Sequence, residues 1–312
     1  MAPTSPETGA ASAPMRDNAD MNSPVSPPVT PQPLQPSKPL PQPRIAFIGG
    51  GNMASAIVGG LLQQGYPAQA LHIVEPVAEQ RSRLAQQFPG VALHPAADSA
   101  LADAALVLWA VKPQVFKQAA LECAPHLSAS ALHLSVAAGI RSDSMVRWLG
   151  SERIVRAMPN TPALVGLGMT GLYARPAVSS AEREQVQALL AGTGCTLWLA
   201  QESDLDAVTA LSGSGPAYVF YFLEAMRRAG TELGLTPQAA TELAIGTFVG
   251  AAQLAQRSSE PPEVLRQRVT SKGGTTHAAL SAMEAAQIAD SFVAAIAAAH
   301  RRAREMGAEF GD

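Results

Sequence analysis

Residues 45–60 read IAFIGGGNMASAIVGG, and this stretch decides the fold that we expect for most of the chain. The apolar run 45–48 is long enough for one buried parallel strand. Three glycines at 49–51 end that run, and Asn52 and Met53 open a segment whose apolar residues recur at helical spacing. The stretch therefore predicts a strand, a glycine turn and a helix in direct succession.

The turn has the pattern G-x-G-x-x-A, which is typical of a dinucleotide-binding loop. Gly49 permits the tight turn, Gly51 lets the backbone approach a pyrophosphate, and Ala54 lets the helix pack close to the strand. The helix N-terminus offers N–H groups and a positive dipole end to the phosphates. We expect Gly49, Gly51, Asn52 and Met53 to bind a dinucleotide; an ordinary tight turn is the alternative.

Composition limits the possible functions. The chain has 312 residues, is 47% hydrophobic and carries a formal net charge of −3, so it can form one or two domains. This near-neutral balance argues against nucleic acid as the main partner. No apolar run approaches the roughly 18 residues needed to cross a bilayer, so no membrane contact is expected. Cys123 and Cys195 are the only cysteines; they suit a reducing, cytoplasmic compartment and lack metal-ligand spacing.

Residues 1–43 differ sharply in composition from the rest. They hold 12 of the 25 prolines and show no apolar periodicity. Such a segment cannot bury enough surface to offset its ordering entropy, so we expect a disordered extension or a misassigned start codon. A proline-rich docking tail is the alternative. A secretory signal is not expected, because no positive region precedes an apolar one.

Residues 44–203 alternate between expected strands and expected helices, and form the first predicted domain. The strands are expected at 45–48, 71–74, 91–93, 106–111, 132–136 and 154–158, with helices at 77–88, 114–123 and 142–149 among them. This alternation predicts an α/β domain with a Rossmann-type parallel sheet and right-handed crossovers. Two later strands, 170–174 and 195–199, flank a helix at 181–191 and extend the sheet at its edge.

Residues 204–312 show no strand signal and form the second predicted domain, which is all-α. The segment 211–216 (LSGSGP) predicts a turn that leads into a helix ending near 233, and further helices follow to about 306. These helices are rich in alanine, so each buries little area by itself. We infer that this half buries more surface by associating with another copy of the chain.

Ligands of an open parallel sheet bind beyond the carboxyl ends of its strands, so the residues after each strand are the site candidates. They are Glu75, Ala110, Val111, Lys112, Pro113, Ala137, Ala138, Gly139 and Asn160. Lys112 is either a partner of a cofactor phosphate or a solvated loop residue. The small residues at 137–139 leave room for a nicotinamide. Asn160 is either a fixed amide at the reaction centre or a turn-stabilising residue.

A second glycine loop, SKGGTT at 271–276, precedes a predicted helix. It places successive N–H groups and two hydroxyls at a helix N-terminus, which suits a small carboxylate. A glycine hinge with a threonine N-cap is the alternative. The histidines form no metal constellation, and His72 and His133, within expected strands, are interpreted as core residues.

Together these motifs resemble the pyrroline-5-carboxylate reductase family. The matching stretches are IAFIGGGNMASAIVGGL, AVKPQVF, SVAAGI, RAMPNTPALVGLGMT, DAVTALSGSGPAYVF and SKGGTTHAAL, in the family's order over about 44–305. The resemblance implies reduction of 1-pyrroline-5-carboxylate to L-proline, the last step of proline biosynthesis, with NADPH or NADH. It also implies an intertwined dimerisation domain and dimers assembled into a decamer. The active site is then shared between the dinucleotide domain of one subunit and the glycine loop of its partner.

The resemblance also assigns roles within the second glycine loop. It implies substrate binding by Ser271, Gly273, Gly274, Thr275 and Thr276, with amides on the carboxylate and the Thr276 hydroxyl facing the substrate nitrogen as the catalytic group. The chain departs from the family at position 272, which is Lys where proline is usual. The alternatives are a related imine reductase, a β-hydroxyacid dehydrogenase or a non-catalytic cofactor-binding protein.

The end of the second expected strand departs from the family as well. Many members carry a pair suited to a 2′-phosphate there, whereas this chain has Val74 and Glu75. Glu75 comes 24 positions after Gly51, near the spacing at which an acidic side chain accepts the ribose 2′-OH. A 2′-phosphate there would meet roughly 3 kcal/mol of repulsion. Arg81 and Arg83 would offset some of this repulsion if their helix turned them toward the ribose, and a Glu75 that merely faces solvent is the alternative. We predict that NADH is used at least as well as NADPH.

Overall fold

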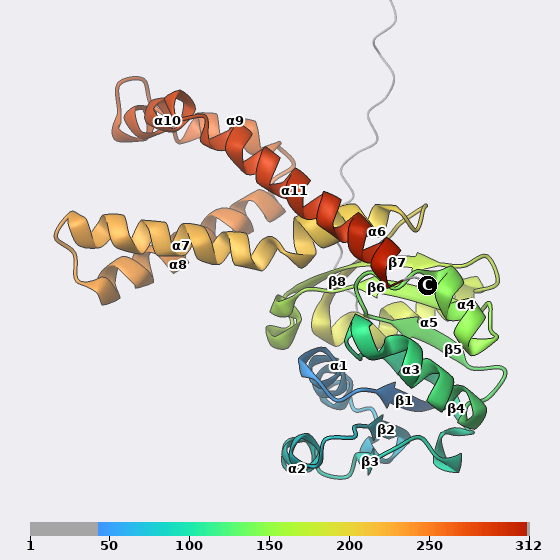
Figure 1. Cartoon of the computed structure of the whole chain (residues 1–312). Helices are drawn as coiled ribbons and strands as arrows, with labels where there is room; N and C mark the ends of the chain where they lie inside the picture. Colours follow the sequence, from blue (N-terminus) through green and yellow to red (C-terminus); the bar gives the residue numbers. More distant parts are fainter. Residues whose placement is uncertain (1–42, 311–312) are drawn as a thin grey trace, which may run out of the picture. The chain divides into compact units, whose positions relative to one another are not determined.

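The structure is a computed structural model that describes residues 43–310 (Figure 1). The extension predicted at 1–43 lies outside this range, apart from Pro43. Within the described range the strands form one eight-stranded sheet in the order β3-β2-β1-β4-β5-β6-β7-β8. The strands are β1 (Arg44–Ile48), β2 (Leu71–Val74), β3 (Ala92–His94), β4 (Ala104–Trp109), β5 (Leu132–Ser135), β6 (Ile154–Met158), β7 (Gly168–Ala174) and β8 (Gly194–Trp198).

Strands β1 to β6 are parallel, as the alternation of strands and helices predicts, but the last two strands run the other way. β7 pairs antiparallel with β6, and β8 pairs parallel with β7. The reason is the length of the connection between β6 and β7, which holds only the short 3₁₀ segment η4 (Thr161–Val165). A parallel crossover needs a dozen or more residues, so the chain turns straight back. The expected extension of the sheet edge is thus present, with reversed direction.

Helices cover both faces of the sheet. They are α1 (Asn52–Gln63), α2 (Ala78–Gln87), α3 (Pro113–Cys123), α4 (Ser142–Leu149) and α5 (Ser180–Leu190). Ile45 and Phe47 of β1 face a core shared with α1 and α5, whereas Ala46 and Ile48 face a core shared with α3 and α4. Alternate residues of a strand point to opposite faces, so a sheet covered on both sides needs apolar residues throughout. The run 45–48 meets that need.

The second half is helical throughout. It contains α6 (Asp204–Val208), α7 (Gly215–Glu232), α8 (Pro237–Arg257), α9 (Pro262–Arg268), α10 (Thr275–Ala285) and α11 (Ile288–Glu309). The turn predicted at 211–216 is wrong in part, because Thr209–Gly213 is a π-helical segment that continues α6. The N–H of Ser214 donates to the carbonyl of Thr209, five residues back. A Cβ at Gly213 would lie 2.5 Å from Met158 Cε, so glycine lets this segment press onto the end of β6.

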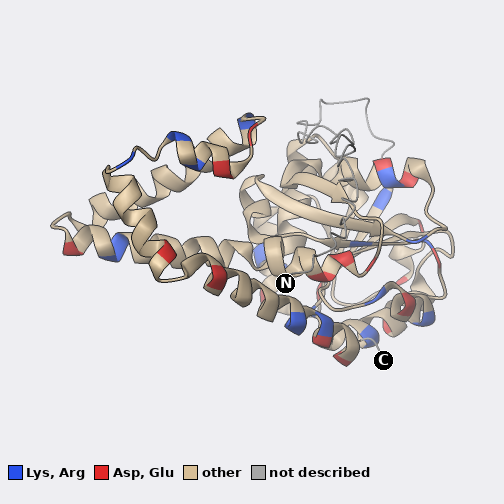
Figure 2. Ribbon diagram, turned by 90° about the horizontal axis from the view of Figure 1, so that it is seen from above, with Lys and Arg blue, Asp and Glu red and all other residues tan. Residues whose placement is uncertain are grey.

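The helical half buries few large side chains. Its buried apolar residues are mainly alanines, such as Ala240, Ala244 and Ala303, while α7 and α8 expose Phe220 and Leu243. Charged residues occur along these helices and gather at the C-terminal end of α11 (Figure 2). Among the described residues no single helix is long and apolar enough to cross a membrane, although α10 and α11, bent by 55° at their junction, pass that test as a pair.

Candidate cofactor and substrate site

The first glycine loop brings the ends of three strands together. Gly49 has a φ of +95°, and its N–H donates to the carbonyl of Val74 at 2.9 Å. A Cβ at Gly49 would lie 2.8 Å from the carbonyl oxygen of Ala110 and 3.0 Å from Val111. Glycine is therefore required here both by backbone conformation and by space. The contact joins the loop after β1 to the exits of β2 and β4.

The N-terminus of α1 is open for an anion. Gly51 is the N-cap, and nothing lies within 4 Å of the position that a Cβ would occupy. No side chain caps the helix, and its first turn, which begins with Asn52 and Met53, holds no acidic residue. The first N–H groups of a helix have no intrahelical partners. These features fit the pyrophosphate of a dinucleotide, as the loop pattern predicts.

Glu75 lies directly after β2 and contacts the glycine loop. Its Oε2 accepts the N–H of Gly50 at 3.0 Å, and its Oε1 accepts the N–H of Val77 at 2.9 Å. Gln80 of α2 donates from Nε2 to the carbonyl of Gly50 at 2.7 Å. The residue predicted to read the ribose is thus part of a hydrogen-bonded link between the first loop and α2.

The exits of β4 and β5 form the other side of the crevice. The N–H of Ala110 donates to the carbonyl of Ile48 at 2.8 Å. Lys112 is exposed and is the N-cap of α3, and Pro113 is the first residue of that helix. After β5, the N–H of Ala137 donates to Ser135 Oγ at 3.2 Å. Small residues thus follow both strands, at the edge where we expect the nicotinamide.

The loop 137–139 also contacts the last helix. Gly139 has a φ of +76°, and a Cβ there would lie 3.2 Å from Met306 Cβ of α11. One residue further along α11, a Cβ at Gly307 would lie 3.3 Å from the guanidinium of Arg141. The C-terminal end of α11 therefore packs directly against the predicted nicotinamide loop. Ala138 lies within this packed turn.

Asn160 has both ends of its amide engaged with backbone. Its Oδ1 accepts the N–H of Met169 at 3.0 Å, and its Nδ2 donates to the carbonyl of Ser212 at 3.1 Å. This geometry favours the turn-stabilising interpretation, with one N–H left over. Asn160 and Ser212 lie at one side of a cavity of about 510 Å³ whose other walls are mainly apolar side chains such as Phe222 and Phe292. Among the buried side chains that the structure describes, Ser212 Oγ has no hydrogen-bond partner.

An ion pair that the sequence did not reveal holds the elements around the nicotinamide loop. Arg156 of β6 donates from Nη1 to Glu202 Oε1 at 2.8 Å, and the same carboxylate accepts the N–H and the hydroxyl of Ser142, each at 2.6 Å. Burial raises the pKa of Glu202, but Arg156 and the Ser142 hydrogen bonds outweigh it, so the net pKa is lowered. These residues are 46 and 60 positions apart, and no local pattern connects them.

The second glycine loop has a conformation that only glycine adopts readily. Gly273 has a φ of +77°, and the N–H of Gly274 donates to the carbonyl of Ser271 at 3.0 Å. Gly274 is the N-cap of α10, so Thr275 and Thr276 are its first two helical residues and neither is the cap. No side chain caps the N–H groups of this helix. The loop therefore offers free donors and the Thr276 hydroxyl at one helix start.

Within one chain the nicotinamide loop 137–139 and the second glycine loop adjoin opposite ends of α11. The last residues of α11 pack against Gly139, whereas α10 and its loop adjoin the first residues of α11. From Ile288 to Gly307 the helix rises about 30 Å at 1.5 Å per residue. Figure 1 likewise draws α10 beyond the end of α11 that is away from the sheet. A single chain does not bring residues 271–276 to its own nicotinamide edge.

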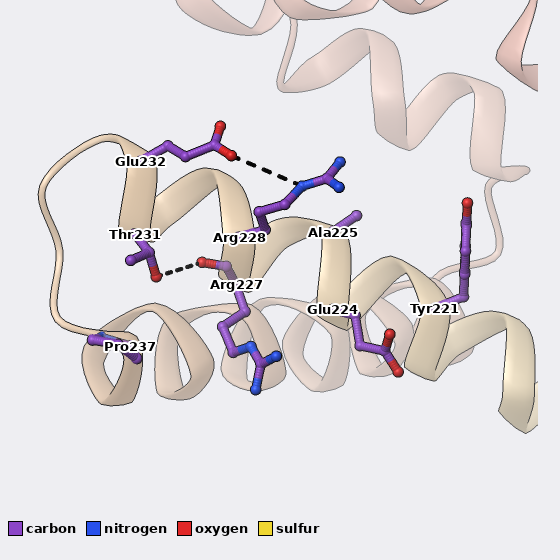
Figure 3. Close-up of a pocket in the computed structure, with 8 residues that line it drawn as sticks. All are labelled: Tyr221, Glu224, Ala225, Arg227, Arg228, Thr231, Glu232 and Pro237. Carbon is purple, nitrogen blue, oxygen red and sulfur yellow. Dashed lines mark hydrogen bonds and ion pairs between the residues drawn. The ribbon is translucent and has the colours of Figure 1, made fainter.

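A groove on the helical half holds none of the predicted site residues. It lies along α7 and the start of α8, with a volume of about 510 Å³ (Figure 3). Its walls carry the ion pair between Arg228 and Glu232, at 4.0 Å, and the hydrogen bond from Thr231 Oγ1 to the carbonyl of Arg227. The groove is therefore separate from both glycine loops.

Comparison with known proteins agrees with this arrangement. Residues 202–306 match the family model for pyrroline-5-carboxylate reductase dimerisation, and residues 44–139 match that for NADP oxidoreductase, coenzyme F420-dependent. Over 270 residues the chain is 46% identical to the pyrroline-5-carboxylate reductase of Pseudomonas aeruginosa, covering 86% of this chain and 98% of that protein. The chain belongs to the pyrroline-5-carboxylate reductase family.

Other members of the family support this membership along nearly the same length. The reductase of Haemophilus influenzae is 42% identical over 271 residues, covering 84% of this chain and 97% of that protein. The reductase structure from Coxiella burnetii superposes with a TM-score of 0.78 at 36% identity, covering 85% and 98% of the two chains. The structure from Plasmodium falciparum, which has NADP bound, superposes with a TM-score of 0.75 at 28% identity over 85% and 98%. The all-α half of this chain is thus a dimerisation domain, and the sheet half is an NADP-binding domain.

Proposed function

We propose that this protein reduces 1-pyrroline-5-carboxylate to L-proline with NADPH or NADH, as the last step of proline biosynthesis. The observation that carries the proposal is the pair of uncapped helix starts behind glycine loops. One, at α1, is open for a dinucleotide pyrophosphate, and the other, at α10, offers uncapped N–H donors for a small carboxylate. An amino-acid substrate and a nicotinamide cofactor require both receptors.

In the proposed reaction the main task of the protein is to position the substrate and the cofactor. The nicotinamide supplies a hydride, and a cyclic imine protonated on nitrogen is already electrophilic at carbon. The chain's own residues hold the reactants in contact. The amides of Gly273 and Thr275 bind the carboxylate, and Thr276 Oγ1 faces the ring nitrogen. The amide of Gly274, which the family resemblance also assigns to the carboxylate, donates instead to the carbonyl of Ser271 within the loop. Small residues at 137–139 leave the space in which the two rings meet.

A second copy of the chain completes the proposed site. The loop 271–276 is separated from its own nicotinamide edge by about 30 Å of α11, so a partner's loop has to supply the carboxylate receptor. The apolar side chains exposed on α7 and α8, including Phe220 and Leu243, support an extensive contact between copies. We further propose that dimers assemble into a decamer in the cytoplasm. The free cysteines, Cys123 and Cys195, agree with a reducing compartment.

A direct assay tests the proposal. The full-length protein is mixed with pyrroline-5-carboxylate and NADPH or NADH, and cofactor oxidation is followed together with the appearance of L-proline. We expect both in stoichiometric amounts. A protein that binds the cofactor but forms no proline would instead be a non-catalytic binding protein. Turnover of other cyclic imines at equal efficiency would favour a general imine reductase.

A further inference from the structure

The exit of β2 carries a cationic group that the proposed mechanism does not use. Arg81 lies in the first turn of α2 and is half-buried. Its Nη1 donates to the carbonyl oxygens of Glu75 and Pro76, at 2.7 and 2.8 Å. These two hydrogen bonds hold the guanidinium beside the two residues that follow β2. The other arginine of this helix, Arg83, lies in its second turn and pairs instead with Glu79 at 2.5 Å, and both of these side chains are well exposed.

The position of Arg81 relative to the cofactor follows from the links between the first two strands. Gly49 is hydrogen-bonded to Val74, and Gln80 to the carbonyl of Gly50, so the first turn of α2 lies against the glycine loop. In a doubly wound sheet the adenosine ribose lies beyond the carboxyl end of the second strand, next to this loop. Arg81 is therefore held at the end of β2, where protein side chains contact the 2′ position of the ribose.

The two charged groups at this strand end differ in the donors and acceptors that they leave available. Nε and Nη2 of Arg81 have no hydrogen-bond partner within residues 43–310, which leaves three N–H donors of the guanidinium. The Glu75 carboxylate already accepts two backbone N–H groups. A guanidinium fork matches the oxygens of a phosphate, whereas a carboxylate accepts a hydroxyl. The site thus presents an acceptor for a 2′-OH and donors for a 2′-phosphate side by side.

We propose that Arg81 is a specificity-determining residue that binds the 2′-phosphate of NADPH. Glu75 by itself would favour NADH, and Arg81 supplies the opposite charge, so that both cofactors are used. The inference rests on the proposed use of a nicotinamide cofactor. It also explains why the family's usual pair is not needed at positions 74 and 75, because the cation comes from α2, six residues after Glu75.

Binding of two cofactor fragments to the full-length protein tests the role of Arg81 without turnover. Adenosine 2′,5′-bisphosphate and 5′-AMP differ by the 2′-phosphate, and calorimetry gives a Kd for each. We expect Arg81→Ala to weaken the bisphosphate about tenfold, the lower end for a charge-assisted hydrogen bond at a half-buried site, and 5′-AMP less than twofold. Arg83→Ala, on the same helix, is the matched control and should change neither Kd by more than twofold.

The possible results separate the inference from the function on which it rests. An unchanged ratio of the two Kd values in Arg81→Ala would overturn the inference, as would an equal loss for Arg83→Ala, which would indicate a long-range field. Equal weakening of both fragments by Arg81→Ala would mean that Arg81 only supports the loop after β2. A wild-type protein that binds neither fragment would overturn the proposed cofactor use itself.

Discussion

In the sheet half of the chain Phe47, Trp109 and Phe116 are fully buried, whereas in the helical half Phe220 and Tyr221 are 58% and 71% exposed. The sheet half closes its two cores within one chain, because helices cover both faces of the strands. The helical half buries mainly alanines and keeps its large apolar side chains outside. The sheet half therefore buries its large apolar side chains within one chain. The helical half buries its large apolar side chains to a comparable extent only by contact with a second copy.

The largest expected effect comes from placing a charge on the exposed face of the helical half. Leu243→Asp in α8 should convert the dimer to monomers and lower kcat at least about a hundredfold, because burying a carboxylate in an apolar contact costs several kcal/mol. The matched control is Leu121→Asp in α3, since Leu121 and Leu243 are 53% and 59% exposed. Sedimentation and turnover are measured for both variants. A Leu243→Asp protein that stays dimeric and active would contradict the comparison of the two halves.

A second test probes the closed core of the sheet half through pH. Burial, with a further contribution from Arg153, lowers the pKa of His133 to about 4, and its Nδ1 accepts the indole N–H of Trp109 at 3.2 Å. In the unfolded chain a histidine has a pKa near 6.5. Between that pH and about 4, the unfolded chain therefore binds a proton at this position and the folded chain does not. Stability contributed by neutral His133 is therefore present above pH 6.5 and lost toward pH 4, by about 3 kcal/mol in total.

The measurement is the free energy of unfolding in denaturant between pH 7 and 4.5. Replacement of His133 by Gln should lower stability at pH 7 and flatten its decline with acid. Replacement of His277, an exposed histidine of α10, is the control and should leave the slope unchanged. Equal slopes for the wild type and His133→Gln would show that another group causes the acid sensitivity.

The third test addresses the loop 271–276, which we propose one copy supplies to the site of the other. Thr276→Ala removes a hydroxyl at the start of α10, and loss of one hydrogen bond to a charged group costs roughly 1.5–3 kcal/mol. We expect kcat/KM to fall about 10- to 150-fold while the melting temperature changes little. Thr270→Ala is the control, because that hydroxyl donates to the carbonyl of Arg266 at 2.6 Å and not to the proposed site. If kcat/KM of a stable Thr276→Ala protein is unchanged, Thr276 has no catalytic role.

A smaller effect is expected at the end of β2. The wild type should use NADH at least as well as NADPH, and Glu75→Ser should raise the kcat/KM ratio of NADPH to NADH about tenfold. This is less than the roughly 3 kcal/mol of an isolated charge pair, because the guanidinium of Arg81 lies at the same strand end. Glu79→Ser, whose carboxylate pairs with Arg83, is the control. A wild type that prefers NADPH tenfold or more would contradict the role of Glu75.

The smallest effect is expected from removing residues 1–42. Their composition, with 11 prolines before Pro43, offers no apolar face that either half needs. The truncated protein should keep its melting temperature and kcat/KM within experimental error. A loss of several degrees, or of tenfold in kcat/KM, would show that this segment contributes to one of the two halves.

The sequence by itself determined the order of strands and helices, because apolar runs, glycine turns and helical spacing are local. It predicted the pyrophosphate loop at Gly49 and Gly51 and the receptor loop at 271–276 for the same reason, and the roles assigned to these residues stay predictions. Strand boundaries agree with the structure to within two residues for β1, β2, β5 and β6. Local chemistry was also enough to interpret His72 and His133, which are buried and hydrogen-bonded.

Only the tertiary structure decided which distant groups meet. The reversal of β7 depends on the length of a connection. The close approach of Gly213 to Met158 and the Arg156–Glu202 ion pair join residues 55 and 46 positions apart. The tertiary structure also decided that Arg81, and not Arg83, lies at the end of β2. The packing of Leu84 into the core sets the rotation of α2 about its axis, and so sets which arginine faces the strand end. Long-range contacts of this kind produce no periodic pattern in the sequence, because the two partners are far apart in the chain and meet only when it folds.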